Sequence, residues 1–208
     1  MSNVLNPQAN TFEETVQWLR AGKAAVFPTD TVYGLGVSVM HAHGLSALYD
    51  LKQRDAGKPI AWLVGGVFDL NRYGLDVPDY AHDLAQRFWP GALTLIVRAS
   101  DAVPRAFVSS SGSVGLRMPA SDITIALIDA VGSPLATTSA NLSGCADTGQ
   151  FDNLDATLLQ QAGCALRDDA PKSGLASTVV DCTGEKPVVL RAGGVDMNSG
   201  SSDSSIGS

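Results

Sequence analysis

The sequence has few cysteines and no long apolar run. Cys145, Cys164 and Cys182 are odd in number and show no Cys-x-x-Cys spacing, which favours reduced thiols in the cytosol over a disulfide frame or a zinc site. No apolar run approaches the roughly 20 residues that a membrane-spanning helix needs, and residues 1–10 lack the pattern of a signal peptide. We therefore expect a cytoplasmic protein that makes no contact with membranes.

Positive charge is also scarce. The chain has 14 Lys and Arg against 21 Asp and Glu, which gives a formal net charge of −7. Such a chain should not attract nucleic acid or an anionic membrane over a broad surface, although a small basic pocket can exist within an acidic surface. The 208 residues, of which 45% are hydrophobic, suit one domain with a sizeable core.

The hydrophobic pattern predicts a mixture of helices and strands. Thr11 opens a first helix with a capping-box pattern, and Gly22 ends it. Further helices are expected near 44–51, 79–89, 123–131 and 154–162, and strands at 24–31, 59–64, 93–98, 114–118, 177–182 and 187–191. Because helices and strands do not alternate strictly, we expect an α/β or α+β sheet with some antiparallel pairs. From residue 193 onward the composition predicts a disordered tail.

Polar side chains interrupt the apolar pattern within residues 136–144. Thr137, Ser139 and Asn141 are spaced two apart, so an extended strand would point all three to one face. Neutral donors and acceptors of this kind suit a polar small molecule. A strand end that turns and caps the next helix explains the same residues, and on this segment alone it is the better explanation.

Two threonines precede a glycine-rich stretch in the segment 27–36. Thr29 and Thr31 are expected on one face of the strand at 24–31, and Gly34 and Gly36 would let backbone approach a ligand closely. The stretch is neither a Walker A loop nor a complete Gly-x-Gly-x-x-Gly fingerprint. A tight turn explains the glycines equally well.

Three cations follow the second predicted helix. Lys52 and Arg54 would diverge if the helix continued, but both could face one cleft if it ends there, with Lys58 close by. Such a group can bind phosphate, because Arg offers a bidentate fork and Lys a point charge. The alternative is that these residues are solvated at a helix C-terminus, where cations are favoured.

Arginines also lie on or at the ends of predicted strands. Arg117 alternates with Val114, Leu116 and Met118, so it falls on the face opposite the apolar one. An arginine on a sheet face needs an anion, which either a protein carboxylate or a ligand can supply. Arg191, at the end of the last predicted strand, likewise needs an anion from the protein or from a ligand. Ser177 places a hydroxyl at the start of a predicted strand.

Other catalytic patterns are missing from the sequence. His41 and His43 have no third metal ligand at a recognisable spacing, and no Ser-His-Asp arrangement or catalytic carboxylate pair can be identified. An enzyme built from the residues above would therefore act by positioning its substrates and neutralising their charge.

Taken together and in order, these stretches resemble the YrdC-like threonylcarbamoyl-AMP synthases in their short, single-domain form. The similarity extends over about residues 11–195, which leaves 1–10 as an N-terminal extension and 196–208 as a tail expected to be disordered. It rests on the segments 28–36, 52–54 with 58–59, 89–94, 114–119, 138–144, 177–181 and 190–193.

The resemblance implies a YrdC-like twisted mixed α/β sheet flanked by helices, with a concave, positively charged cavity. It also implies that L-threonine, bicarbonate and ATP, accompanied by Mg²⁺, are converted to threonylcarbamoyl-adenylate and pyrophosphate. The adenylate would pass to a tRNA threonylcarbamoyl-transferase complex for N6-threonylcarbamoylation of adenosine 37. No protein side chain is assigned to the metal, which the phosphates and water would hold.

The same resemblance implies a role for each candidate residue. Lys52 and Arg54 would neutralise phosphate oxygens in the transition state, and we expect both in an open cleft, where Ala would lower turnover without loss of the fold. Ser139, Asn141 and Arg191 would hold the nucleotide. The amino acid would lie among Thr29, Thr31, Arg117, Thr137 and Ser177.

Two positions depart from the family pattern. Leu63 stands where some members have a histidine, so the threonine contact at this position is not carried over. The usual Ser/Pro-rich continuation after Gly144 is replaced by residues 145–148, and no nucleotide contact is assigned there.

Two other readings remain open. An RNA-binding module would use a similar groove, and weak binding of tRNA or double-stranded RNA is compatible with clustered cations. A related carbamoyl-adenylate chemistry, as in hydrogenase-maturation carbamoyltransferases, belongs to much larger proteins with additional domains.

Overall fold

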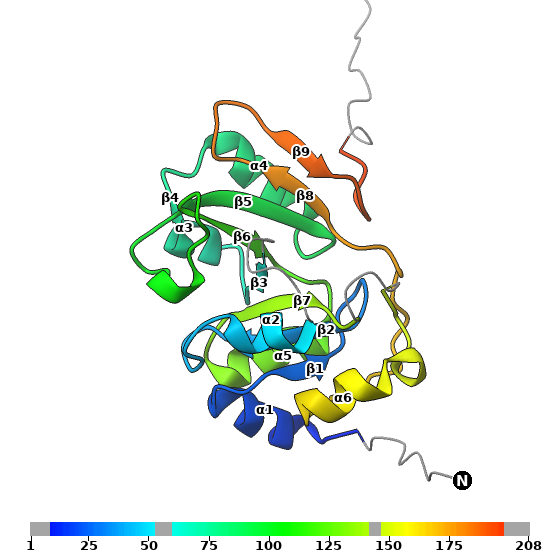
Figure 1. The fold of residues 1–208 in the computed structure, drawn as a ribbon. Helices are drawn as coiled ribbons and strands as arrows, with labels where there is room; N and C mark the ends of the chain where they lie inside the picture. The colour runs from blue at the N-terminus through cyan, green and yellow to red at the C-terminus, as the bar shows by residue number, and fades with distance from the viewer. Residues whose placement is uncertain (1–8, 53–59, 142–146, 198–208) are drawn as a thin grey trace, which may run out of the picture.

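A computed structural model describes residues 9–52, 60–141 and 147–197. Its centre is a nine-stranded mixed sheet in the order β1-β2-β7-β3-β6-β5-β8-β9, with the short β4 paired to β5 (Figure 1). The strands are β1 (Ala25–Phe27), β2 (Gly34–Ser38), β3 (Ala61–Leu63), β4 (Gly74–Leu75), β5 (Leu93–Ala99), β6 (Ser113–Arg117), β7 (Leu135–Ser139), β8 (Thr178–Asp181) and β9 (Val188–Arg191).

The sheet combines parallel and antiparallel pairs, as the irregular alternation of elements predicts. β3 pairs parallel with β6, and β5 pairs parallel with β8. The other pairs are antiparallel, including β2 with β7 and β8 with β9. The predicted class of a twisted mixed sheet flanked by helices is therefore confirmed.

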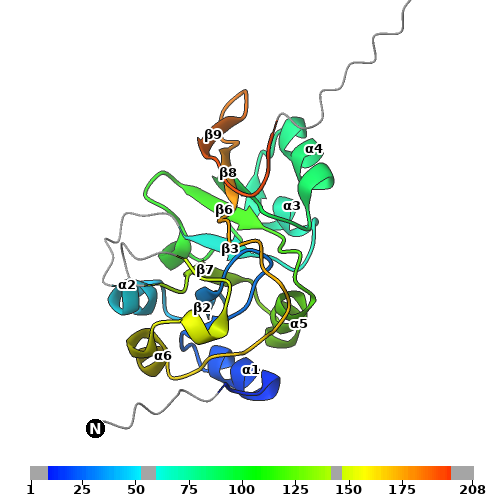
Figure 2. The same cartoon turned by 90° about the vertical axis from the view of Figure 1, so that its right-hand side faces the viewer.

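Helices cover both faces of the sheet near β1, β2 and β7. The α-helices of the described residues are α1 (Phe12–Arg20), α2 (Ser46–Lys52), α3 (Asp69–Tyr73), α4 (Asp79–Phe88), α5 (Asp122–Val131) and α6 (Ala156–Ala162). Of these, α3 and α4 lie at the other end of the sheet, where they contact β4 and β5 respectively. Figure 2 shows α2 and α6 on one side of the sheet and α1 and α5 on the other, and each of these pairs is in contact. None of these helices, in the described part of the chain, is long and apolar enough to cross a bilayer.

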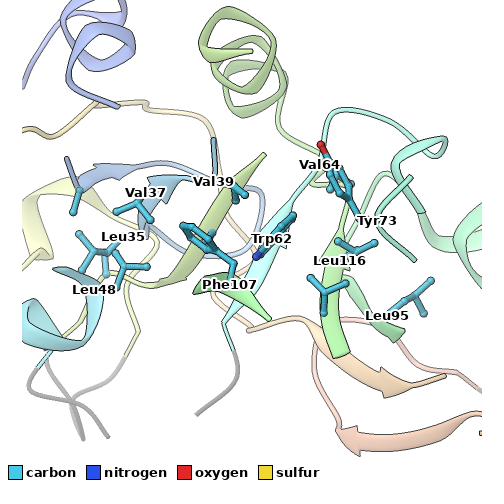
Figure 3. Packing of buried hydrophobic residues seen from close by; sticks show 14 of the residues in the cluster. Leu35, Val37, Val39, Leu48, Trp62, Val64, Tyr73, Leu95, Phe107 and Leu116 are labelled. Atoms are coloured by element: carbon cyan, nitrogen blue, oxygen red, sulfur yellow. The ribbon is translucent and has the colours of Figure 1, made fainter. Parts of the chain in front are cut away.

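The alternation of side chains along each strand builds two hydrophobic clusters. Ala25 and Phe27 of β1 pack with α1 and α5 in the smaller cluster, whereas Val26 belongs to the larger one. At the centre of the larger cluster the Trp62 ring meets the rings of Tyr73 and Phe107 edge to face (Figure 3). Hydrophobic side chains thus pack on both faces of the sheet.

Most predicted helices are present within a few residues of the expected bounds. The capping box of Thr11 is formed, because its hydroxyl accepts from the Glu14 amide while the Glu14 carboxylate accepts from the Thr11 amide. The predicted strand at 24–31 is wrong beyond Phe27, since residues 28–33 form a loop. The glycine-rich stretch that follows this loop is strand β2, and α3 and β4 were not predicted.

Two of the three thiols lie in the described residues. Cys164 and Cys182 are free and buried, as expected for a chain without a disulfide frame. Burial, together with the nearby Asp181 carboxylate, raises the pKa of the Cys182 thiol to about 12. Cys145 and the expected disorder of residues 198–208 lie outside the described residues.

Gly36 shows why glycine is required in β2. A Cβ atom there would lie 2.8 Å from the Thr137 hydroxyl oxygen and 2.9 Å from the backbone oxygen of Ala136. We expect Gly36→Ala to destabilise the fold by about 1–3 kcal/mol, because the backbone of β7 would have to move. Thermal unfolding measures this loss. Gly184→Ala is the matched control, since a Cβ at Gly184 meets nothing within 4 Å, and an equal loss in both variants would contradict the explanation.

Candidate active site

A cavity of about 490 Å³ opens on the polar face of the sheet. We call it the first cavity. It is lined by the loop 29–34 and by residues of strands β3, β5, β6, β7, β8 and β9. Seven of the ten predicted site residues line it: Thr29, Thr31, Arg117, Thr137, Ser139, Ser177 and Arg191.

Arg117 is the buried cation of this cavity, with only 6% of its surface exposed. Its guanidinium donates to the Asp30 carboxylate at 2.5 Å, to the Thr31 hydroxyl at 3.0 Å and to the Gly91 carbonyl at 3.0 Å. The sequence predicted that Arg117 would need an anionic partner, and in the structure that partner is the Asp30 carboxylate. Burial lowers the pKa of the guanidinium, and the Asp30 charge opposes that shift.

The partners of Arg117 leave part of its fork unused. A guanidinium carries five N–H donors, and three of them are occupied by the contacts above. Among the described residues the other two make no hydrogen bond. Arg117 thus lines the first cavity with donors to spare beyond those that bind Asp30, Thr31 and Gly91.

Thr29 and Thr31 lie together in the loop and not on a strand face as predicted. The Thr29 hydroxyl donates to the Val32 carbonyl at 2.6 Å and lies 3.0 Å from the Thr31 hydroxyl. Because Thr29 uses its proton on Val32, Thr31 donates to Thr29 and accepts from Arg117. The loop itself is fixed by the amides of Ser173 and Gly174, which donate to the carbonyls of Asp30 and Thr31.

Arg191 and Ser177 form the opposite wall. Two nitrogens of Arg191 donate to the Ser177 carbonyl at 3.1 and 2.9 Å, and one of them reaches the Ser177 hydroxyl at 3.2 Å. That hydroxyl also lies 2.8 Å from the hydroxyl of Thr94. Within the described ranges Arg191 forms no salt bridge, so its charge is available to an anionic ligand.

Lys52 is buried, with 4% of its surface exposed, so the expectation of an open cleft is wrong for this residue. Its ammonium group donates to the Ser139 carbonyl at 2.8 Å and to the Asn141 side-chain oxygen at 2.9 Å. Ser139 in turn donates to the same Asn141 oxygen at 2.7 Å. The cation after α2 and the polar end of β7 therefore form one cluster. Arg54, Lys58 and residues 142–146 lie outside the described residues.

The polar face predicted for residues 136–144 is present only in part. Thr137 and Ser139 both line the first cavity. Strict alternation ends at Thr138, whose hydroxyl also accepts from Lys52 at 3.3 Å. Asn141 follows the strand and contacts Lys52 without lining the cavity. The division between an amino acid at Thr137 and a nucleotide at Ser139 and Asn141 stays a prediction.

A second cavity of about 800 Å³ adjoins the first and was not predicted. Its polar lining includes Arg98, Asp181 and five serines, Ser46, Ser109, Ser110, Ser111 and Ser113. The hydroxyls of Ser109, Ser111 and Ser113 lie 2.9 Å from one another. The serine-rich run at 109–113 was the signal available in the sequence, but such a run is equally typical of a solvated turn.

The histidine pair shows no metal site. The Nδ1 atom of His41 lies 2.7 Å from the Ser38 hydroxyl, which places His41 in a local contact. Within residues 9–52, 60–141 and 147–197, no three His, Cys, Asp or Glu side chains are grouped as metal ligands.

A mixed sheet with hydroxyl-rich adjoining cavities and buried cations is an arrangement suited to small polar or anionic molecules. The model of the Sua5/YciO/YrdC family, described as "Telomere recombination", matches residues 17–193. The chain therefore belongs to the Sua5/YciO/YrdC family.

Individual relatives agree with this assignment. The threonylcarbamoyl-AMP synthase of Pyrococcus abyssi is 34% identical over 180 residues, which cover 86% of this chain and 53% of that protein. A Mycobacterium leprae relative is 35% identical over 91% of this chain and 86% of its own length. The crystal structure of P. abyssi Sua5 complexed with L-threonine superposes with a TM-score of 0.80 at 33% identity, covering 88% of this chain and 54% of that one. The chain thus spans about half the length of the P. abyssi protein.

Proposed function

We propose that this chain makes L-threonylcarbamoyl-adenylate from L-threonine, bicarbonate and ATP, with release of pyrophosphate, for N6-threonylcarbamoylation of tRNA. The observation that carries the proposal is buried Arg117, which lines a cavity of about 490 Å³ and has two N–H donors that make no hydrogen bond among the described residues. Relatives that bear the name threonylcarbamoyl-AMP synthase, and one solved with L-threonine, support the same assignment.

The first cavity suits the amino acid. Arg117 would hold the carboxylate in bidentate geometry, and the hydroxyls of Thr31, Thr137 and Ser177 would orient the remaining polar groups. Leu63, which is 2% exposed, lines the same cavity and offers an apolar contact where some relatives carry histidine. The combination selects a small amino acid with both polar and apolar parts.

The main barrier to the proposed reaction is repulsion between negatively charged groups. The threonine nitrogen would form a bond to the carbon of CO₂ and lose a proton; CO₂ arises from bicarbonate by protonation and loss of water. The resulting carbamate oxygen would then attack the α-phosphorus as the bond to the β-phosphate breaks. Because carbamate and triphosphate are both anions, cations that neutralise phosphate oxygens lower the barrier. Lys52 and Arg191 would serve in this way, as would Arg54.

Mg²⁺ would enter with the triphosphate in this proposal. The described lining of the two cavities offers mainly hydroxyls, with one carboxylate in each, Asp147 in the first and Asp181 in the second. This donor set fits a metal that is held chiefly by phosphates and water, as Mg²⁺ commonly is. The bound metal would neutralise phosphate charge.

Pyrophosphate release tests the proposal directly. With ATP and Mg²⁺ present, we expect release only when L-threonine and bicarbonate are both added. L-serine, which lacks the methyl group, should support slower release at equal concentration, because loss of one methyl contact in a pocket is worth about 1–3 kcal/mol. Release that ignores threonine would refute the synthase assignment.

Transfer of the product to a tRNA-modifying complex and weak binding of RNA stay predictions. The net charge of −7 argues for feeble RNA binding. A filter-binding assay with tRNA at low salt tests the prediction of weak RNA binding. Absence of binding at low salt would contradict that prediction.

A further inference from the structure

Bicarbonate is the one substrate of the proposed reaction to which no residue has been assigned. Its carbon must become bonded to the threonine nitrogen, and one of its oxygens must then bond to the α-phosphorus. A bicarbonate subsite therefore has to lie between the residues assigned to threonine and those assigned to the nucleotide. Members of both sets line the first cavity, so the subsite belongs within that cavity.

A pair of buried hydroxyls lies where the two sets of residues meet. Ser177, assigned to threonine, accepts a hydrogen bond at 3.2 Å from Nη2 of Arg191, assigned to the nucleotide. The Ser177 hydroxyl also lies 2.8 Å from the hydroxyl of Thr94. Thr94 lines the first cavity but was not predicted as a site residue. Only 3% of Thr94 and 6% of Ser177 is exposed.

The sheet holds the Thr94 side chain in one orientation. Its strand, β5, lies between β6 and β8. The methyl carbon of Thr94 is the nearest atom, at 3.4 Å, to the position that a Cβ would take on Gly115 in β6. The Thr94 hydroxyl instead lies against Ser177, which immediately precedes β8. Each branch of this β-branched side chain thus faces one of the two neighbouring strands.

The hydroxyl pair keeps one hydrogen for a ligand. Each hydroxyl has one hydrogen to donate, and the contact between Thr94 and Ser177 uses one of the two. Among the described residues, neither hydroxyl donates to any other acceptor. A buried donor that lacks an acceptor is costly, so an oxygen atom of a bound ligand would be stabilised at this point.

A chain of donors that starts at Arg191 leaves the hydrogen of Thr94 free. In this chain Arg191 donates to Ser177 and Ser177 donates to Thr94, so that each hydrogen bond polarises the next. In the alternative order the Ser177 oxygen would accept from both Thr94 and Arg191, and the hydrogen of Ser177 would be free. The two orders differ in the residue that contacts the ligand.

The charges around the first cavity favour an anion. Burial is the main cause that lowers the pKa of the Arg117 guanidinium, and the positive charge of Arg191 acts in the same direction. The two guanidinium groups are therefore close enough to repel each other, and both line the first cavity. A small anion in that cavity would relieve the repulsion.

We propose that Thr94, which accepts from Ser177 and is polarised through it by Arg191, binds an oxygen of bicarbonate and then of the carbamate formed from it. The inference rests on the proposed synthase function. Bicarbonate would take up one proton and lose water, and the threonine nitrogen would bond to the carbon of CO₂ and lose a proton. A carbamate oxygen would then displace pyrophosphate at the α-phosphorus. In bicarbonate and in carbamate the negative charge lies on these oxygens, where the Thr94 hydrogen stabilises it.

The test measures pyrophosphate release in buffer depleted of CO₂, with bicarbonate, L-threonine and ATP varied in turn. Thr94→Val removes the hydroxyl and keeps the shape of the side chain. Its KM for bicarbonate should rise by about 10- to 100-fold, because one hydrogen bond to an anion is lost. Its KM values for threonine and ATP should change by less than about twofold, since neither substrate is bound by Thr94.

Two further variants separate this effect from packing. Thr94→Ser keeps the hydroxyl, so it should restore most of the affinity for bicarbonate. Thr15→Val is the matched control, because it removes the hydroxyl of another buried threonine, which donates to the Thr11 carbonyl in α1 and does not line the first cavity. All three KM values of this control should equal those of wild type.

Thr94→Ala replaces the valine variant if that protein does not fold, because alanine introduces no new atom. An unchanged KM for bicarbonate in a folded variant without the Thr94 hydroxyl, or a rise that is not specific to bicarbonate, would overturn the inference and leave the synthase function standing. Wild-type protein without threonine-dependent release would instead refute the function itself, before any variant is measured.

Discussion

Replacing Arg117 by alanine should weaken L-threonine binding by at least about 100-fold, since two hydrogen bonds to a charged group are lost at about 1.5–3 kcal/mol each. The same change should destabilise the protein by about 3–5 kcal/mol, because it leaves the Asp30 carboxylate without its partner in a largely buried position. Titration calorimetry and chemical denaturation measure the two effects separately.

Two further variants sharpen this result. Arg117→Lys keeps the charge but loses the planar fork, so it should recover part of the stability and little of the threonine affinity. Arg167→Ala is the matched control, because Arg167 also pairs with carboxylates, Asp152 and Asp169, but on the surface. Its loss of stability should be much smaller than that of Arg117→Ala, because solvent screens exposed ion pairs. Unchanged threonine affinity in Arg117→Ala would remove Arg117 from the binding site.

Replacing Lys52 by methionine should lower turnover by about 100- to 1,000-fold, the usual effect of removing one group that stabilises charge in a transition state. Methionine preserves an unbranched apolar stem, so the change chiefly removes the ammonium group. Threonine affinity should hardly change, since Lys52 contacts Ser139 and Asn141 and does not line the first cavity. Steady-state kinetics with ATP and threonine varied in turn separates the effect on turnover from the effect on threonine affinity.

Lys52→Ala is expected to lose stability as well as activity, in contrast to the expectation from the sequence. The buried ammonium group donates to the Ser139 carbonyl and to the Asn141 side-chain oxygen, and its removal loses these hydrogen bonds to a charged group, at about 1.5–3 kcal/mol each. Lys23→Ala removes an exposed lysine that lies over the Trp18 ring and serves as the control. Full turnover in Lys52→Met would exclude a role for the ammonium charge.

The elements of the fold were predictable where one periodicity dominated. The helix at 79–88 and the strands at 93–99 and 113–117 have clear apolar patterns. All three were predicted within one residue of these bounds. The loop at 28–33 was not predictable, because its conformation depends on Arg117 and on the amides of Ser173 and Gly174, which are far away in the sequence. Local pattern cannot report contacts of that range.

The candidate site shows the same limit. Five of the seven predicted residues that line one cavity carry a polar group on or next to an otherwise apolar strand, and the other two, Thr29 and Thr31, lie in the loop after β1. The burial of Lys52 escaped prediction, since a lysine at a helix end is usually solvated and its oxygen partners come from β7. The second cavity escaped as well, because a run of serines has no periodicity that separates a cavity wall from a turn.

The order of the strands also fixes when the site can form during synthesis. The loop that supports Arg117 is complete only after the amides of Ser173 and Gly174 have bonded to the carbonyls of Asp30 and Thr31. A nascent chain therefore holds no finished site until about 140 residues after that loop have left the ribosome, and pairings of such range form slowly. For that interval the nascent chain has neither its complete sheet, since β8 and β9 come later still, nor a finished site that substrates could stabilise.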